Sequence, residues 1–556
     1  MRKKSIMKFI GVESMKRNRL LTKYLALIAS ATLAVGCVGC DSTTESTEAS
    51  TGMTSSTESQ NTKDSKSTEK VLRVATATLP ETLDANASVS NAGIQVYYNI
   101  YDTLIMRDTS ADEPTFLPGL AESWEQVEDL VWEFKLREGV KFHDGTTMDA
   151  EDVCYSMNRV INQEQADYLT AYSYLLSNFE KFEVVDNLTV RAYTKNTEPL
   201  LESLLSDPNV GISSKEYCES VGLDESGLAP ITTAPYKVVS FDPGHSVVLE
   251  RFDEYWGEVA PFARIEITCI PEIVSRITAL QNGEVDFITN IPPDQETMLA
   301  GNTNVNIIGD VLPMYHIYRL NMTNELTDDA NLRAALDYAI DRETLVNTIW
   351  LGKADVADGY QFEQCGEYYL EDRENEITYD LEKAKELIAA SDYNGELIQI
   401  YNQTDYYTYA DLAAQAVMEM WKEIGVNVEL VEAESMSTFT NEEQEVRTWS
   451  NPLYYQDPMG VIERHWSPEG AQVNTGHFVA SEDYTKQFEI ARYSTDATER
   501  KEALGNLYDY YRSETPFIYL YRPYESVAVS TTLNYKIPSN ARAYTLGFRA
   551  GEISVK

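Results

Sequence analysis

The stretch from residue 117 to residue 160 constrains the fold more than any other part of this sequence. Trp132, Phe134 and Leu136 alternate with charged residues, which is the two-residue period of a half-buried strand. The string His-Asp-Gly-Thr that starts at His143 has the composition of a tight turn. After it, Asp149 is placed to cap a helix whose apolar residues recur on one face. The stretch therefore predicts a strand, a turn and a helix in direct succession.

The same change between helical and strand periods returns further along the chain. Leu412, Ala416 and Met420 recur at helical spacing, and Gly425 follows them as a helix stop. Helices that alternate with strands indicate an α/β architecture. With 556 residues the chain is also too long for one compact core, so we expect at least two lobes.

Taken as one string, residues 117–160 resemble the signature block of the extracellular solute-binding proteins of family 5, which serve peptide and nickel ABC importers. Three segments carry the resemblance: AESW at 121–124, LREGVKFHDG at 136–145 and AEDVCYSMNR at 150–159. Strings that resemble later landmarks follow in the family's order, so the likeness covers nearly all of residues 71–556. They are LQNGEVDF, NLRAALDYAIDRETLV, YDLEKAKELI, IGVNVEL and TPFIYLYRPYESVAV.

The resemblance implies an α/β fold of the periplasmic-binding-protein type, with two lobes, a hinge between them and an extra small domain on lobe I. In such a fold the chain leaves lobe I, builds lobe II and returns. Two crossings form a hinge, and the cleft beside it closes on a ligand. The implied boundaries are 71–111, 231–310 and 515–556 for lobe I, 112–230 for the extra domain, and 311–514 for lobe II.

The N-terminal segment indicates an export signal with a lipid attachment site. A basic region precedes an apolar run from Tyr24 to Gly36, which is too short to span a membrane. Its end, LAVGCVGC, resembles a bacterial lipobox, with Cys37 as the expected lipidation site and Cys40 as the alternative, so residues 1–37 are expected to be a lipoprotein signal peptide. Residues 41–69 are dominated by Ser, Thr and Glu, which predicts a disordered tether that holds a folded body off a membrane.

Charge and the lack of local catalytic motifs narrow the function. The chain carries 45 Lys and Arg against 89 Asp and Glu, a net charge of −44, which disfavours nucleic acid as a partner. No nucleophile elbow, phosphate-binding loop or HExxH motif occurs, and the five histidines are scattered. We therefore expect no enzyme activity, no cofactor and no metal site. The cysteines outside the signal region show no CxxC spacing and are expected to be unpaired core residues; they are Cys154, Cys218, Cys269 and Cys365.

Tyrosine is unusually frequent, with 36 residues, and its positions bear on ligand binding. A rigid aromatic face with a hydrogen-bonding tip suits clefts that hold peptides or sugars, although a packing role stays open for each tyrosine. The clusters of interest are Tyr97 with Tyr98, Tyr406 and Tyr407 with Tyr409, and Tyr454 with Tyr455.

The loop TWSNPLYYQDPMG, residues 448–460, resembles the family loop that ends in an acidic residue and a proline, here Asp457 and Pro458. In peptide-binding members an aspartate four residues before that proline binds the free α-amino group of the ligand. This chain has Tyr454 there, and a neutral phenol offers an ammonium no ion pair. The family's loop tryptophan falls at Asn451, whereas this sequence has Trp449, so a local shift of register, or an Asp457 that turns inward, stays open.

These features predict an extracytoplasmic solute-binding lipoprotein, anchored to the outer face of the cell membrane, that delivers its ligand to the permease of an ABC importer. An oligopeptide is the expected cargo on the family resemblance, and Tyr454 favours an oligosaccharide or another polar solute as the alternative. A surface peptide receptor without a transport role is a further alternative. The candidate ligand-binding residues are Tyr97, Tyr98, Trp449, Asn451, Tyr454, Tyr455 and Asp457.

Overall fold

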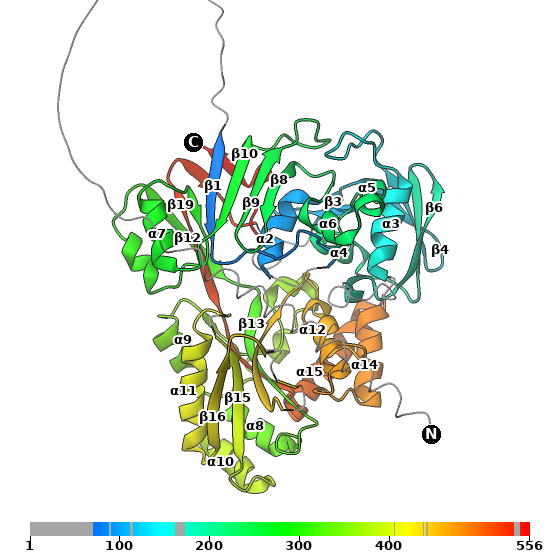
Figure 1. The fold of residues 1–556 in the computed structure, drawn as a ribbon. Helices are drawn as coiled ribbons and strands as arrows, with labels where there is room; N and C mark the ends of the chain where they lie inside the picture. The colour runs from blue at the N-terminus through cyan, green and yellow to red at the C-terminus, as the bar shows by residue number, and fades with distance from the viewer. Residues whose placement is uncertain are drawn as a thin grey trace, which may run out of the picture. The chain divides into compact units, whose positions relative to one another are not determined.

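The computed structural model describes residues 70–87, 91–111, 115–161, 173–404, 406–436, 439–440, 443–538 and 545–556 (Figure 1). The predicted signal peptide, the tether, Cys37 and Cys40 lie outside these residues. Within them, no helix combines the length and the apolar composition that crossing a bilayer requires.

A seven-stranded sheet forms the centre of what we call the first lobe. Its strand β1 pairs in parallel with β10 and β11. Leu72 and Val74 of β1 pack on one face with α2, and Ala75 packs on the other face with α7. The order across the sheet is β12 (Val305–Val311), β19 (Tyr524–Ser530), β11 (Phe287–Ile288), β1 (Val71–Thr76), β10 (Arg264–Cys269), β9 (Ser246–Arg251) and β8 (Tyr236–Asp242), with the helices α2 (Asn91–Ile100) and α7 (Ile273–Gln281).

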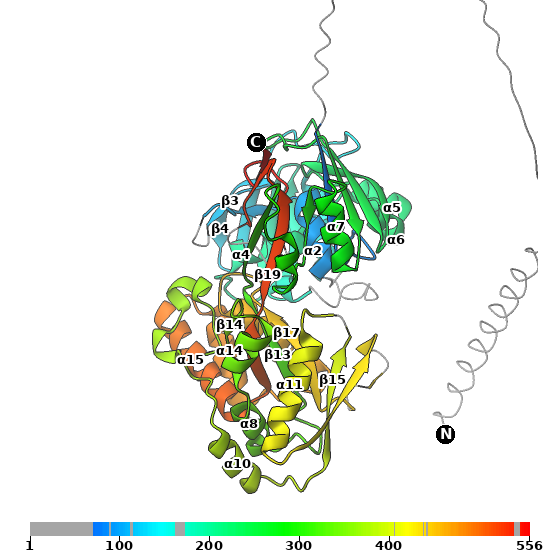
Figure 2. The same ribbon diagram turned by 90° about the vertical axis from the view of Figure 1, so that its left-hand side faces the viewer.

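A six-stranded sheet forms the centre of the second lobe. Tyr318 and Leu320 of its strand β13 pack against α8, α9 and α11 on one face, and Tyr315 and Ile317 pack against α12, α14 and α15 on the other. Figure 2 shows α11 and α15 on opposite sides of β13 and β17. The order is β14 (Asp355–Val356), β18 (Phe517–Arg522), β13 (Met314–Leu320), β17 (Val446–Pro452), β15 (Leu397–Gln403) and β16 (Asn427–Ala433). The helices are α8 (Ala330–Tyr338), α9 (Arg342–Ile349), α10 (Leu381–Ala390), α11 (Ala410–Glu423), α12 (Met459–Trp466), α13 (Ala471–Asn474), α14 (Glu482–Tyr493) and α15 (Ala497–Glu514).

The helix predicted from Leu412, Ala416 and Met420 is confirmed as α11, but its buried face is offset by one residue. Leu412 is 51% exposed, whereas Val417 and Trp421 are fully buried. The indole N–H of Trp421 donates to a backbone carbonyl of α8 at 2.9 Å. The largest apolar side chain therefore decides which face of this helix enters the core.

A four-stranded antiparallel sheet and the helix α3 (Ala150–Ile161) form a small domain, which contains the predicted strand, turn and helix. Gly145 has φ +90° in the turn, and the carboxylate of Asp149 accepts a hydrogen bond from the N–H of Glu151 at 2.8 Å at the start of α3. Val153 and Met157 are fully buried, which confirms the apolar face. The sheet order is β4 (Ala121–Glu128), β5 (Val131–Leu136), β7 (Thr189–Thr194) and β6 (Phe179–Asp186).

The chain passes between the two large sheets twice. The first passage joins β12 to β13, and the second joins β18 to β19, which Figure 1 shows in red. Since β18 pairs with β13, the second passage falls after Arg522. Short elements complete the described chain: β2 (Ile105–Arg107), β3 (Phe116–Pro118), α4 (Leu201–Leu204), α5 (Lys215–Val221), α6 (Leu223–Leu228), β20 (Leu533–Tyr535) and β21 (Ile553–Val555).

The four cysteines of the described residues are free thiols, as predicted. Cys154, Cys218 and Cys365 are buried. Cys269 is only half-buried, and its thiol donates to the carbonyl of Ala77 at 3.3 Å. The expectation that all four are core residues therefore holds for three of them.

Candidate functional site

The loop that follows β17 lies beside the first passage between the sheets. Strand β17 ends at Pro452, whose missing N–H cannot extend a ladder. The N–H of the next residue, Leu453, donates to the carbonyl of Pro313 at 2.8 Å. Pro313 lies between β12 and β13, so the loop is held where the chain leaves one lobe for the other.

Tyr454 is buried in this loop and contacts residues outside the second lobe. Its hydroxyl accepts a hydrogen bond from Arg464, and its carbonyl accepts one from Nη2 of Arg107 on β2 at 3.3 Å. Its ring lies 5.6 Å from the ring of Tyr174, which precedes β6 of the small domain. At the position where the resemblance implies an aspartate, the structure thus has a phenol beside a guanidinium, an environment that disfavours an ammonium group.

Asp457 forms a buried ion pair. Both of its carboxylate oxygens accept hydrogen bonds from Nη2 of Arg500, at 3.0 and 2.9 Å. One of them also accepts from the N–H of Met459, at the start of α12. Asp457 therefore anchors the loop to α15 and binds the first N–H of α12, and its carboxylate is engaged by these groups.

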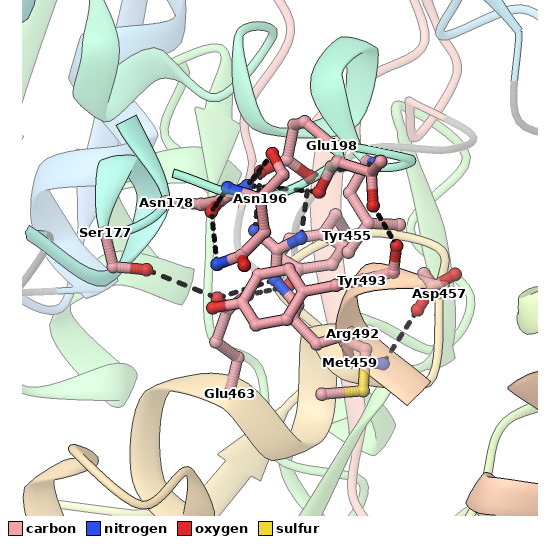
Figure 3. Close-up of polar contacts among 12 residues, drawn as sticks. Ser177, Asn178, Asn196, Glu198, Tyr455, Asp457, Met459, Glu463, Arg492 and Tyr493 are labelled. Atoms are coloured by element: carbon pink, nitrogen blue, oxygen red, sulfur yellow. Dashed lines mark hydrogen bonds and ion pairs between the residues drawn. The ribbon is translucent and has the colours of Figure 1, made fainter. Parts of the chain in front are cut away.

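Tyr455 is hydrogen-bonded to a buried network of charged side chains (Figure 3). Its hydroxyl donates to Glu463 at 2.6 Å, and Glu463 accepts from Nε of Arg492 at 2.8 Å. The two Nη atoms of Arg492 donate to the two carboxylate oxygens of Glu198 at 2.7 and 2.8 Å, and Glu198 also accepts from Asn178 at 3.0 Å. The side chains of Arg492 and Glu198 are 0% exposed.

This network joins the small domain to the second lobe. Glu198 follows β7 of the small domain, whereas Glu463 lies on α12 and Arg492 on α14. Burial raises the pKa of Glu463 although Arg492 acts in the opposite direction. The pairing of Glu198 with Arg492 could not be predicted from the sequence, because the two residues are 294 positions apart and neither belongs to a local motif.

Trp449 borders a half-buried patch of aromatic and basic side chains. The guanidinium of Arg447 lies 4.4 Å from the centre of the Trp449 ring, and the ring of His465 lies at 5.9 Å. Tyr407, from the cluster noted in the sequence, hydrogen-bonds Ser450 on β17 through its hydroxyl at 3.0 Å. Burial lowers the pKa of His465 well below its usual value, so its ring is neutral.

Asn451 is fully buried within the second lobe. Its Nδ2 donates to the hydroxyl of Tyr519 on β18 at 3.0 Å, and its Oδ1 has no hydrogen-bond partner in the described part of the chain. The side chain thus contributes to the sheet interior beside the loop.

Tyr97 and Tyr98 lie on α2, in the first lobe. Tyr97 is fully buried, and its hydroxyl donates to the carbonyl of Thr82 at 2.8 Å. Tyr98 donates to Glu552 at 2.5 Å and lines a cavity of about 560 Å³. Arg107 also lines this cavity and is the residue that bonds the carbonyl of Tyr454, so the cavity borders the β17 loop.

The cavity has a polar wall with paired charges. Asp102 accepts from Arg549 at 3.0 Å and from the indole N–H of Trp256 at 2.8 Å. The volume of the cavity falls within the range of ordinary small-ligand sites. Across the described residues, no three His, Cys, Asp or Glu side chains converge in a geometry suited to a metal ion.

Two α/β sheets joined by two passages, with a small domain in buried contact with the second lobe, define a two-lobed binding protein. The chain belongs to the bacterial extracellular solute-binding proteins of family 5, because the sequence model of the middle region of that family matches residues 115–472. This confirms the family expected from the signature block.

Individual relatives agree with this assignment. The glutathione-binding protein GsiB of Salmonella paratyphi A is 28% identical over 356 residues, which is 64% of this chain and 67% of that protein. The periplasmic binding protein DppA of Helicobacter pylori, solved with the peptide STSA, superposes with a TM-score of 0.79 at 20% identity, over 88% of this chain and 98% of that one.

A dipeptide-binding protein of Pseudoalteromonas sp. SM9913, solved with Met-Leu, gives a TM-score of 0.77 at 19% identity, over 88% of this chain and 100% of that one. These structures confirm the two-lobed α/β fold. The function class expected from the sequence, a solute-binding protein of the kind that serves ABC importers, is likewise confirmed.

Proposed function

We propose that this protein captures an oligopeptide between its two lobes and delivers it to the permease of an ABC importer. The observation that carries the proposal is the set of contacts that hold the second lobe against the rest of the chain: Arg107 with the carbonyl of Tyr454 in the β17 loop, and the buried pair of Arg492 with Glu198. Such contacts describe a closed form that a ligand would stabilise. The relative that is named as a glutathione-binding protein supports a small peptide as the cargo.

We assign residues 71–111 and 231–310 to lobe I, with the small domain at 112–230. The pairing of β18 with β13 supports a return to lobe I at residue 524, where the sequence alone suggested 515. Lobe II would then run from 311 to 523. The two passages between the sheets would serve as the hinge, because they connect the strands of one lobe to those of the other.

The candidate contacts with the ligand are the β17 loop and the aromatic residues around it. Trp449, Tyr454 and Tyr98 offer aromatic faces or hydroxyl tips close to the lobe junction. Asn451, Tyr455, Asp457 and Tyr97 have buried partners in the protein, so we assign them to holding the loop and α2 in place.

A polar solute other than a peptide, such as an oligosaccharide, is the second candidate. The observation that favours it is Tyr454 beside Arg464, since this pair provides no carboxylate for a free amino terminus. A receptor that binds a peptide without transport would have the same cleft and would lack a partner permease.

We further propose a lipid anchor at Cys37, or else at Cys40, with residues 41–69 as the tether on the outer face of the membrane. The ligand would be bound and released unchanged, so the protein would not be an enzyme. Mass spectrometry of the N-terminal peptide tests the anchor, because a diacylglyceryl group on Cys37 or Cys40 adds a defined mass.

A thermal-shift screen of the purified protein against peptide and oligosaccharide pools tests the cargo, because a ligand that binds only the folded state raises its stability. A shift with peptides supports the main proposal. If acetylation of their amino termini abolishes the shift, a carboxylate elsewhere in the chain binds the amino group. A shift with sugars alone assigns the cargo to the second candidate.

A further inference from the structure

The cavity of about 560 Å³ described above lies between the first lobe and the small domain. Its lining comes from three parts of the chain, which begin at Tyr98, Ser206 and Lys536. Among the described residues that line it, none belongs to the second lobe, and the cavity approaches that lobe at Arg107, which bonds the carbonyl of Tyr454 at 3.3 Å. The cavity is therefore distinct from a cleft between the two lobes.

Aromatic and apolar side chains that the protein covers only in part form much of this lining. Tyr255 and Trp256 are half-buried, and their ring centres lie 5.3 Å apart. Met106 is half-buried as well, and Leu117 is 40% exposed. A molecule with an apolar surface would remove these side chains from water, which favours its binding.

The charged groups in the buried wall are paired within the protein. The carboxylate of Asp102 accepts hydrogen bonds from Arg549 at 3.0 Å and from the indole N–H of Trp256 at 2.8 Å. The other two guanidinium nitrogens of Arg549 donate to the carbonyls of Tyr98 at 2.8 Å and Tyr101 at 2.5 Å. Each nitrogen of this guanidinium thus has an acceptor in the protein.

The second acid of this wall, Glu552, is engaged in the same way. One of its carboxylate oxygens accepts from the hydroxyls of Tyr98 at 2.5 Å and Thr109 at 3.0 Å, and the other accepts from the N–H of Arg549 at 3.0 Å. The remaining charged residues of the lining are two bases and two acids: Arg107, Lys536, Asp108 and Glu258. Because the two signs nearly cancel, the lining offers an ionic ligand little to offset the loss of its hydration.

We propose that this cavity binds a neutral small molecule with an aromatic or similarly flat apolar ring, at a second site separate from that of the transported solute. Four aromatic residues of the lining can contact such a ring, and offset or edge contacts between rings are favourable; they are Tyr98, Tyr101, Tyr255 and Trp256. The inference goes beyond the proposed function, because capture and delivery of a solute do not require this site.

The test uses three naphthalene compounds that share one ring system and differ in charge. Naphthylmethanol is neutral, naphthoate is an anion and naphthylmethylamine is a cation at neutral pH. Calorimetry and equilibrium dialysis with the purified protein give the Kd and the stoichiometry. The variant A550F places a ring in the cavity, because Ala550 is half-buried in the lining. The matched control V274F adds the same ring to α7 of the same lobe, at a position that is 52% exposed.

We expect one molecule of naphthylmethanol to bind per chain, and both charged compounds to bind at least about 10-fold more weakly, because burial of an unpaired charge is unfavourable. A550F should weaken binding of naphthylmethanol about 10-fold or more, since the new ring occupies its space. V274F should bind it like the unmodified protein. If A550F does not fold, M106A replaces it; this variant removes apolar lining and should raise the Kd about 3- to 10-fold.

The contrary results separate this site from the proposed function. Absence of saturable naphthylmethanol binding, or equal binding by folded A550F and V274F, would overturn the site. Tighter binding of naphthoate or naphthylmethylamine would overturn the assignment to a neutral ligand. Displacement of naphthylmethanol by the peptide or oligosaccharide pool would overturn the separation from the transport site. Binding of naphthylmethanol as predicted, without capture from either pool, would overturn the proposed function and leave this site standing.

Discussion

The pairing of Arg492 with Glu198 should act as a latch for the closed form, and E198Q tests this directly. The substitution keeps the shape of the side chain and removes its charge, so Arg492 retains Glu463 and loses one carboxylate. Removing one partner of a buried ion pair costs about 3–5 kcal/mol. Because Arg492 keeps Glu463 as its second partner, we expect E198Q to destabilise the closed form by about 2–3 kcal/mol.

This cost applies to the closed form alone if the small domain and the second lobe separate on opening, because water then solvates both groups. A ligand that binds only the closed form then shows a higher apparent Kd by the same free energy. An increase of about 30- to 150-fold is expected. The control is E180Q, which removes a charge from the exposed Glu180 of β6 in the same domain and should leave Kd unchanged.

Titration calorimetry gives the Kd, and small-angle X-ray scattering gives the open fraction without ligand, which E198Q should increase. An unchanged Kd with a lower melting temperature would refute the reasoning. That result would mean that Glu198 and Arg492 stay together in the open form and that the small domain moves with the second lobe.

Three further predictions follow from buried groups. D457N leaves Arg500 without its carboxylate partner and should lower the free energy of unfolding by about 3–5 kcal/mol, measured by urea denaturation. Y454F removes the hydroxyl that accepts from Arg464; calorimetry should show a changed affinity with a melting temperature close to that of the unmodified protein. Burial raises the pKa of Glu525 to about 8. The folded form therefore holds this proton more tightly than the unfolded chain, so the stabilisation is present at low pH and is lost as pH rises from about 5 to about 8; E525Q should remove this part of the pH dependence of the melting temperature.

The local sequence pattern was sufficient to predict those elements whose signals lie close together in the chain. The strand that ends at Leu136, the turn at Gly145 and the helix capped by Asp149 were all predictable, because each depends on neighbours within a few positions. The orientation of α11 was not, because Leu412 and Val417 fit equally good helical stripes and only the neighbouring helix shows which one is buried.

The position of the 448–460 loop in the chain was predictable, but the contacts of its residues were not. The loop at 448–460 was found by its resemblance, and Tyr454 does contact residues outside the second lobe. The partner of Asp457 was not predictable, because Arg500 reaches it from α15, which is distant in sequence. The same holds for the network beyond Tyr455, because Arg492 reaches the Glu463 partner of Tyr455 from α14.

Ligand capture by the stripped protein tests the central claim most directly. The protein is unfolded in denaturant to release any carried ligand, refolded, equilibrated with a mixed pool of peptides and oligosaccharides, and separated from unbound molecules before mass spectrometry. Retained peptides, together with a smaller radius of gyration than the stripped protein, are predicted. Retention of oligosaccharides alone, or retention of peptides without any compaction, would contradict a peptide-binding protein that closes on its ligand.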